Sequence, residues 1–236
     1  MKCRKRFQFF KMIIILSLLL SSVTFVRAEP IYPAYVFYFT NLGIGGTETI
    51  YKDLTAMGYT AFLEKDWNAK QILEIMDQCA VFVYVGHGSP GILSCTGTQQ
   101  ISALTVPDND MFYSLQAQFS NTETKLSKVR LVYYGSCFSD SDSQTYGRLT
   151  TYTANSLRAT AVIGFSGSVS NQVASHFEAV LFDRLLAGYD VQTAVHLAKA
   201  DAQAHFQDKY ATSNVDTAAV YGNGNVVINP AAFGIR

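Results

Sequence analysis

The sequence lacks most features that would divide it into modules or mark a common ligand. Its 236 residues contain no internal repeat, no low-complexity tract and no Pro/Gly/Ser-rich linker. The glycine cluster "GIGG" at 43–46 is only a fragment of the GxGxxG phosphate loop. No close pairs of Cys and His have the spacing of structural zinc ligands. These absences argue against repeat architectures, nucleotide-binding loops and zinc modules.

Long apolar runs are also missing, although the N-terminus contains a short one. Residues 12–26 form an apolar run of 15 residues, shorter than the roughly 20 that a membrane-spanning helix needs. A basic start precedes this run, and small residues near Ala28 follow it. This layout is typical of a secretory signal peptide cleaved before Glu29. We therefore expect a signal peptide at 1–28, a single domain at 29–236, and a secreted, extracellular protein; an uncleaved anchor is the alternative that the sequence leaves open.

The predicted mature chain has no excess of basic residues. Six of the 18 Lys and Arg residues, and none of the 18 Asp and Glu residues, lie in 1–28, which leaves a net charge of −6. Nucleic acids and anionic membrane surfaces favour proteins rich in Lys and Arg. We expect neither nucleic-acid binding nor stable membrane association once the signal peptide is removed.

Cysteine is scarce, and after cleavage its number is odd. Cys79, Cys95 and Cys137 remain, so at least one thiol has no partner within the chain. A bridge between Cys79 and Cys95 would enclose the segment around His87, but the sequence alone does not decide it. Cys137 is the expected free thiol.

The remaining chain alternates between short apolar segments and amphipathic ones. Apolar, β-branched and aromatic runs such as 34–40, 81–85 and 161–165 are separated by segments with helical spacing, such as 47–57 and 171–187. Near-continuous apolar strands separated by helices are typical of a parallel sheet covered on both faces. Asp66 and Asp190 can cap the helices that follow them, and the segment 91–104 is expected to contain a short hairpin. The predicted fold class is α/β, with a mostly parallel sheet between two helical layers.

Two of the apolar runs end in residues that carry chemistry. "VFVYVGHGSP" (81–90) places His87 just beyond one predicted strand, and "LVYYGSCFSD" (131–140) places Cys137 just beyond another. Ligand sites in open α/β sheets form beyond the carboxyl ends of the strands. Neighbouring strands lie about 4.8 Å apart. If these two strands are parallel neighbours, His87 and Cys137 belong to one site.

An imidazole beside a thiol forms the simplest machinery for attack on a carbonyl group. The imidazole takes the thiol proton and later returns a proton to the leaving amine. Backbone N–H groups near His87, notably that of Gly88, and the N–H of Cys137 can stabilise the oxyanion. Asp140 and Asp142 follow Cys137 closely, and their charge opposes formation of a thiolate unless they point elsewhere. Asp140 could instead bind a basic substrate.

These blocks resemble the His-Gly and Gly/Ala-x-Cys signatures of the caspase-fold cysteine peptidases, especially the bacterial gingipain-like, clostripain-like and CHAT branches. The 50-residue separation between His87 and Cys137 is also close to that of caspases. The resemblance continues through "ATAVIGFSGSVS" and "FEAVLFDRLLAGYDVQTAVHLAKADA", and covers roughly residues 80–205. It implies a three-layer caspase-like domain.

The resemblance also implies an activity and a site. His87 and Cys137 would be the catalytic dyad of an endopeptidase, and Gly88 would contribute to the oxyanion hole. The loop 165–170, with Phe165 and Ser166, would line the pocket for the residue before the scissile bond. Family members that favour Arg or Lys often have an acid in that pocket, and this loop has none. The expected partner is a protein or peptide substrate.

Other interpretations remain open at this point. A cysteine-nucleophile α/β-hydrolase is disfavoured because Ser139 replaces the last glycine of the nucleophile elbow and the required late histidine would have to lie on a helix. A non-catalytic or latent caspase-like interaction domain at the cell surface would keep the fold without using the thiol. No cofactor and no metal is expected. "DND" at 108–110 could contact calcium, but no twelve-residue ligand loop follows it.

Overall fold

The computed structural model describes residues 33–39, 45–121 and 125–233. These residues belong to one compact unit, Ile31–Arg236. The predicted signal peptide, residues 1–28, lies outside the described residues. None of the helices in the described ranges is long and apolar enough to cross a membrane.

A six-stranded sheet forms the centre of this unit, in the order β10-β9-β8-β3-β1-β2. All neighbours pair in parallel except β10, which runs antiparallel to β9 at one edge. The predicted α/β class with a mostly parallel sheet is therefore confirmed. The strands are β1 (Ala34–Tyr38), β2 (Ala61–Lys65), β3 (Val81–Val85), β8 (Leu131–Gly135), β9 (Ala161–Gly164) and β10 (Ala219–Gly222).

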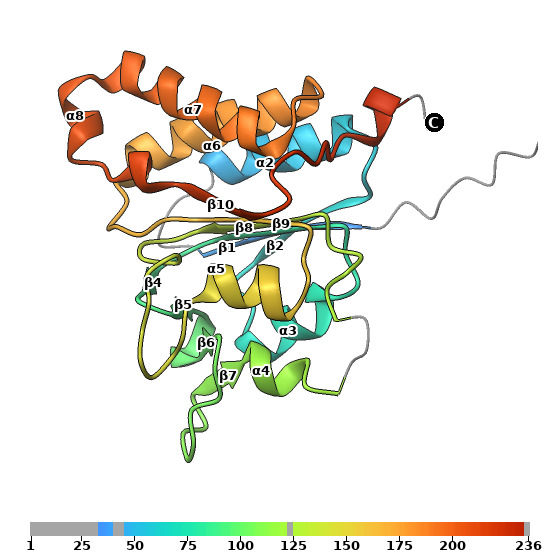
Figure 1. Cartoon of the computed structure of the whole chain (residues 1–236), viewed down its shortest axis with the longest axis vertical. Helices are drawn as coiled ribbons and strands as arrows, with labels where there is room; N and C mark the ends of the chain where they lie inside the picture. The colour runs from blue at the N-terminus through green and yellow to red at the C-terminus, as the bar shows by residue number, and fades with distance from the viewer. Residues whose placement is uncertain (1–32, 40–44, 122–124, 234–236) are drawn as a thin grey trace, which may run out of the picture. The chain divides into compact units, whose positions relative to one another are not determined.

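Helices cover both faces of the sheet, as the apolar strands require (Figure 1). One face is covered by α2 (Gly45–Ala56), α6 (Asn171–Leu186) and α7 (Val191–Phe206). The opposite face packs on α3 (Ala69–Met76), α4 (Leu115–Gln118) and α5 (Leu149–Thr151), which continues as a π-helix over Tyr152–Ser156. A short helix, α8 (Asp208–Ala211), follows α7.

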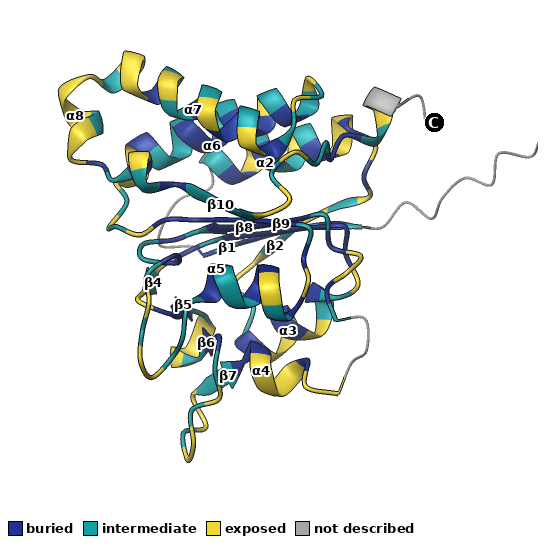
Figure 2. Cartoon of the chain, viewed as in Figure 1, coloured by how far each residue is buried: buried dark blue, intermediate teal, exposed yellow. Residues whose placement is uncertain are grey.

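Alternation along the central strands divides their side chains between two cores. In β3, Val81 and Val83 face the α2/α6/α7 layer, whereas Phe82 and Tyr84 face the α3/α4/α5 layer. β8 follows the same rule, and Tyr133 faces the α6 side. Figure 2 shows the resulting pattern, with buried strands between helices whose outer faces are exposed. The parity of a residue on β3 or β8 therefore decides which layer it faces.

Helix caps agree with the sequence pattern at one helix and differ at another. Asp190 caps α7 as predicted, because its carboxylate accepts a hydrogen bond from the Thr193 N–H at 2.9 Å. α3 is capped by Asn68, which forms a capping box with Gln71. Asp66, the predicted cap, instead has a left-handed backbone with φ of 54°. That prediction was wrong.

A second, smaller sheet is inserted between β3 and β8, in the order β4-β5-β6-β7. The predicted hairpin around 92–102 is present as the antiparallel pair β5 and β6. This insertion begins directly after His87, so it shapes the chain at one strand end of the large sheet. Its strands are β4 (Gly88–Ser89), β5 (Ile92–Ser94), β6 (Gln100–Ser102) and β7 (Phe112–Ser114).

Candidate active site

The ends of β3 and β8 lie side by side at one edge of the large sheet. The two strands are parallel neighbours, and their register pairs Val85 with Gly135. His87 and Cys137 therefore each follow the last paired position by two residues. Both share the parity of residues that face the α6 layer, since Val83 and Tyr133 belong to that core. The sheet thus brings the two side chains to the same edge and toward the same helical layer.

The backbone of His87 is held in place by Tyr84, which belongs to the core on the α3/α4/α5 side of the sheet. The buried Tyr84 hydroxyl lies 2.9 Å from the His87 carbonyl oxygen, which also accepts a hydrogen bond from the Ser94 N–H at 3.0 Å. Gly86 is required because a Cβ there would lie 2.4 Å from the Tyr84 hydroxyl oxygen. The small sheet and the β3 strand end therefore fix where the imidazole begins, while the His87 side chain itself is exposed.

The turn that carries Cys137 is fixed by a buried serine. The Ser139 hydroxyl lies 2.9 Å from the Tyr134 carbonyl oxygen and accepts a hydrogen bond from the Phe165 N–H at 3.1 Å. The Phe138 N–H donates to the Gly167 carbonyl at 2.9 Å. These bonds tie the turn to the loop after β9. Ser139, the residue that departs from the nucleophile elbow, is thus a structural support of this turn.

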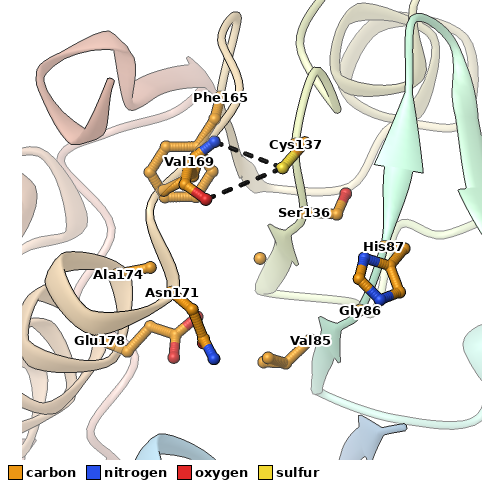
Figure 3. Close-up of a pocket in the computed structure, with 11 residues that line it drawn as sticks. Val85, Gly86, His87, Ser136, Cys137, Phe165, Val169, Asn171, Ala174 and Glu178 are labelled. Atoms are coloured by element: carbon orange, nitrogen blue, oxygen red, sulfur yellow. Dashed lines mark hydrogen bonds between the residues drawn. The ribbon is translucent and has the colours of Figure 1, made fainter. Parts of the chain in front are cut away.

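The Cys137 sulfur is partly buried and has a backbone donor. The Val169 N–H donates to Sγ at 3.3 Å, and the Val169 carbonyl oxygen lies 3.9 Å from Sγ (Figure 3). The Ser168 hydroxyl lies 3.8 Å from Sγ. An N–H aimed at sulfur stabilises negative charge that develops there. No hydrogen bond joins the His87 ring to Cys137 among the described contacts. Catalytic hydrogen bonds are often long in the absence of substrate, so the arrangement is compatible with a dyad.

Gly88 packs tightly against the residues around the thiol. A Cβ on Gly88 would lie 2.7 Å from the Cys137 carbonyl oxygen and 2.8 Å from the Ser136 hydroxyl oxygen. The Ser136 hydroxyl is buried and, within the described part of the chain, has no hydrogen-bond partner. Only glycine lets the two strand ends approach this closely.

A pocket of about 210 Å³ opens between these strand ends and α6. His87 lies on one wall and Cys137 on another, and the loop after β9 and the first turns of α6 complete the lining (Figure 3). The two predicted dyad residues are therefore brought to one pocket. Its lining residues are Val85, Gly86, His87, Gly135, Ser136, Cys137, Phe165, Val169, Asn171, Ala174 and Glu178.

Glu178 is a pocket-lining residue with an ionisable group that was not predicted from the sequence. It lies on α6 and is 3% exposed, and it accepts a hydrogen bond from the Tyr133 hydroxyl at 3.0 Å. Burial raises the pKa of this carboxyl to about 8. Glu178 lies four residues after Ala174 and three before Leu181, so the three share the side of α6 that faces the core. This spacing is the feature of the sequence from which the burial of Glu178 could have been predicted.

Of the three residues predicted to bind substrate, one lines the pocket and two do not. Phe165 lines the pocket. Ser166 is exposed and absent from the lining, with its N–H donated to the Thr217 hydroxyl at 3.2 Å. Asp140 is also absent, and this corrects the expectation that it binds substrate. Its buried carboxylate accepts hydrogen bonds from Thr150 and from the Tyr221 hydroxyl, the latter at 2.8 Å, so it ties the turn to α5 and β10.

The remaining cysteines lie apart from the pocket. Cys79, Cys95 and Cys137 are all free thiols, so the bridge considered between Cys79 and Cys95 is not formed. Burial raises the pKa of Cys79 far above its ordinary value, and that of Cys95 to about 12. Both are therefore poor nucleophiles.

Within the part of the chain that the structure describes, the other histidines and the acids form no metal site. His176 pairs with Asp201 at 2.6 Å across α6 and α7, and its ring stacks on His205. Within the described ranges, no group of three or more His, Cys, Asp or Glu side chains could hold a metal ion.

Comparison with known proteins finds relatives by structure alone. No model of a known protein family and no curated protein sequence matches the chain. The crystal structure of the Arg-specific cysteine proteinase gingipain R matches with a TM-score of 0.58 and 14% identity, over 83% of this chain and 47% of that chain. The complex of the pro- and mature domains of RgpB from Porphyromonas gingivalis matches with a TM-score of 0.57 and 13% identity, over 83% and 48%. Caspase-1 from Spodoptera frugiperda matches with a TM-score of 0.48 and 13% identity, over 80% of this chain and 85% of that chain.

The chain therefore resembles the caspase-fold cysteine peptidases, as the His-Gly and Gly-Ser-Cys blocks predicted, and the caspase-like fold is confirmed. It spans about half the length of the gingipain chains. At these identities the likeness shows the fold, so the activity has to be argued from the pocket itself.

Proposed function

We propose that the protein is a cysteine endopeptidase that uses Cys137 as nucleophile and His87 as general acid and base. The observation that carries this proposal is the register of β3 and β8. It brings an imidazole and a thiol, from positions 50 residues apart, to the lining of one pocket. The thiol has a backbone N–H donor, whereas Cys79 and Cys95 are deactivated by burial.

The reaction follows from these positions. His87 removes the proton from the Cys137 thiol as the sulfur forms a bond to the substrate carbonyl carbon. The C–N bond then breaks, the His87 imidazolium gives its proton to the leaving amine, and a thioester remains on Cys137. Water attacks the thioester with His87 as base, which releases the new carboxyl group and restores the thiol.

The oxyanion formed in both attacks needs donors close to the thiol. We assign this role to the backbone N–H groups of Gly88 and Cys137, because Gly88 packs directly against the Cys137 peptide. The buried Ser136 hydroxyl, which is unpartnered within the described chain, lies beside Gly88 and lines the same pocket. It is a further available donor.

The α/β-hydrolase alternative gains no support from this geometry. It requires a histidine that follows the nucleophile in the chain. The histidine in the lining is His87, which precedes Cys137, and His176 pairs instead with Asp201. We further propose that the substrates are exported or extracellular proteins, in line with the N-terminal pattern of the sequence, and that no cofactor is required.

A peptide library tests the proposal directly. Residues 29–236 are incubated with reductant and a diverse set of peptides, and products are identified by mass spectrometry beside Cys137→Ala and His87→Ala. We expect cuts that share one residue type before the break and that vanish in both variants. Absence of any Cys137-dependent cut, with and without added calcium, would overturn the proposal and favour a non-catalytic interaction domain.

A further inference from the structure

The loop after β9, which contacts the nucleophilic sulfur, is also bonded to a separate segment of the chain. This segment, which we call the support segment, consists of residues 213–217 between α8 and β10. The Ser166 N–H donates to the Thr217 hydroxyl at 3.2 Å. The Ser170 N–H donates to the Ser213 carbonyl oxygen at 3.1 Å. The support segment therefore fixes the loop near both of its ends.

Asn214 of the support segment holds the centre of the loop. Its side-chain amide donates to the Ser168 carbonyl oxygen at 2.8 Å. A Cβ on Gly167 would lie 2.7 Å from Asn214 Cβ, so the Asn214 side chain packs directly against the loop backbone. The Asn214 backbone is left-handed, with φ of 54° and ψ of 16°. Asparagine tolerates this conformation better than most residues, and it also supplies the amide donor.

The Asn214 amide and the Cys137 sulfur bind opposite ends of one peptide group. The carbonyl of Ser168 and the N–H of Val169 belong to the same trans peptide, so they point in opposite directions. Asn214 donates to that carbonyl, and that N–H donates to Cys137 Sγ at 3.3 Å (Figure 3). Hydrogen bonds in series through a peptide group polarise one another, and each strengthens the next. A change at Asn214 is therefore transmitted to the sulfur through a single planar unit.

The orientation of this peptide decides which end of its dipole faces the sulfur. The Val169 N–H makes the closest of the contacts to Sγ, since the Ser168 hydroxyl lies at 3.8 Å and the Val169 carbonyl oxygen at 3.9 Å. If the peptide rotated by half a turn, the Ser168 carbonyl oxygen would face the sulfur in place of the N–H. Its partial negative charge would oppose the negative charge that develops on sulfur during attack. The bond from Asn214 disfavours this rotation because it holds the carbonyl away from the sulfur.

We propose that Asn214 is a positioning residue that keeps the Val169 N–H aimed at Cys137 and so raises the reactivity of the thiol. This inference rests on the proposed peptidase function and deepens it. Asn214 is absent from the pocket lining, so it acts on the reaction through the Ser168–Val169 peptide. It supports the nucleophile and takes no part in substrate binding.

Alkylation of the thiol tests this inference without any substrate. Asn214→Gly removes the amide donor and keeps the left-handed backbone, which glycine adopts freely. The protein and the variant are treated with iodoacetamide at pH 7 and at pH 10, and modification of Cys137 is followed by mass spectrometry. We expect the rate at pH 7 to fall about 10-fold, as for loss of a hydrogen bond to a charged group. At pH 10 the two rates should be similar, because thiols are largely ionised there with or without a donor.

Two control variants separate this role from a general loosening of the loop. Ser141→Ala removes another side-chain donor to a loop carbonyl, the bond of 2.9 Å to Ser166. Gln207→Gly places glycine at another left-handed position, the residue between α7 and α8, where φ is 44°. We expect both to be alkylated at the wild-type rate at pH 7. The inference would be overturned by a wild-type rate in Asn214→Gly, by an equal loss in Ser141→Ala, or by a loss in Asn214→Gly that is the same at pH 7 and pH 10.

Peptide cleavage separates this inference from the proposed function. On a peptide that the wild type cleaves, Asn214→Gly should lower kcat about 10-fold and leave KM nearly unchanged, because the bond acts on the nucleophile and the substrate contacts stay intact. Cleavage by this variant at the wild-type rate would overturn the inference and leave the peptidase function standing. If the wild type cleaves no peptide while alkylation responds as expected, the peptidase function fails and the role of Asn214 at the thiol stands.

Discussion

Glycines allow the two strand ends at the pocket to approach each other, and Gly88 is the tightest of these contacts at the thiol. An added Cβ would meet the Cys137 carbonyl oxygen, the Ser136 hydroxyl and the Ile92 carbonyl oxygen, all within 2.9 Å. Two of these three atoms belong to the backbone, which cannot rotate away. The sequence shows a glycine after the histidine, and the structure shows why a larger residue does not fit.

Gly88→Ala should therefore damage activity more than stability. We expect kcat/KM to fall by at least about 100-fold, as for loss of an oxyanion donor, while overpacking costs about 1–3 kcal/mol of the free energy of unfolding. The control is Gly97→Ala in the small sheet region, where φ is 68° and no atom lies within 4 Å of the added Cβ. It should lose roughly 1–2 kcal/mol from backbone strain and keep full activity. Equal activities of the two variants would contradict the role of Gly88.

Helix α6 lines the pocket from one side of the sheet and packs against α7, whose N-terminus is capped by Asp190. Asp190 accepts hydrogen bonds from the Thr193 N–H at 2.9 Å and from its hydroxyl at 2.7 Å. These bonds lower the pKa of Asp190 below its ordinary value. The stabilisation they give is present above the unfolded-state pKa and is lost as the pH falls through the folded-state pKa.

Asp190→Ala should reduce the free energy of unfolding by about 1 kcal/mol near neutral pH. Asp190→Asn is the matched control, because it keeps an acceptor oxygen for the Thr193 N–H and loses the charge together with the second acceptor oxygen. We expect it to retain most of the stability and to lose the acid-dependent part. Urea unfolding at pH 3 to 7 measures both, and an Ala variant as stable as wild type at pH 7 would contradict the capping role.

The parts of the fold that depend on the pattern of apolar and polar residues could be predicted from the sequence. The apolar strands, the parallel sheet and the placement of His87 and Cys137 at neighbouring strand ends all followed from periodicity and the rules for α/β sheets. The N-cap of α3 could not be predicted in this way, because the side chains of Asp66 and Asn68 can both cap a helix. Only the capping box with Gln71 favours Asn68. The Val169 contact to the thiol was also unreadable, since it comes from a backbone N–H brought near by folding.

Glu178 was missed for a related reason. An acid within an amphipathic helix ordinarily belongs to the solvated face of that helix. Glu178 instead lies directly after Phe177, a residue of the apolar face. Asp140, conversely, was assigned to the site from its closeness to Cys137 in sequence, whereas its carboxylate turns toward Thr150 and Tyr221. Proximity along the chain does not determine the direction of a side chain in a turn.

At the scale of the whole molecule, the buried Glu178 and the half-buried Asp53 link stability to pH. Burial raises the pKa of Glu178 from 4.5 to about 8. Burial and the nearby Asp183 also raise the pKa of Asp53, from 3.8 to about 6. Between the ordinary and raised values the folded state binds more protons than the unfolded state. Stability therefore falls as the pH rises through these windows.

Glu178→Gln should flatten the upper part of this dependence. We expect wild-type stability to fall between pH 5 and 8, by at most about 1.4 kcal/mol per pH unit for this group. The variant should lose little at pH 5 and exceed the wild type at pH 9, because glutamine has no proton to release. Urea unfolding from pH 5 to 9 tests this, and parallel curves for the two proteins would show that Glu178 is not buried as described.

The most direct test of the central claim compares the three thiols of one protein. Residues 29–236 are treated briefly with iodoacetamide at pH 7, and alkylation of Cys79, Cys95 and Cys137 is quantified by mass spectrometry in the wild type and in His87→Ala. We predict rapid modification of Cys137 alone, slowed strongly in the variant, because His87 activates that thiol and burial deactivates the others. Slow modification of Cys137, or a rate unaffected by His87→Ala, would contradict the dyad.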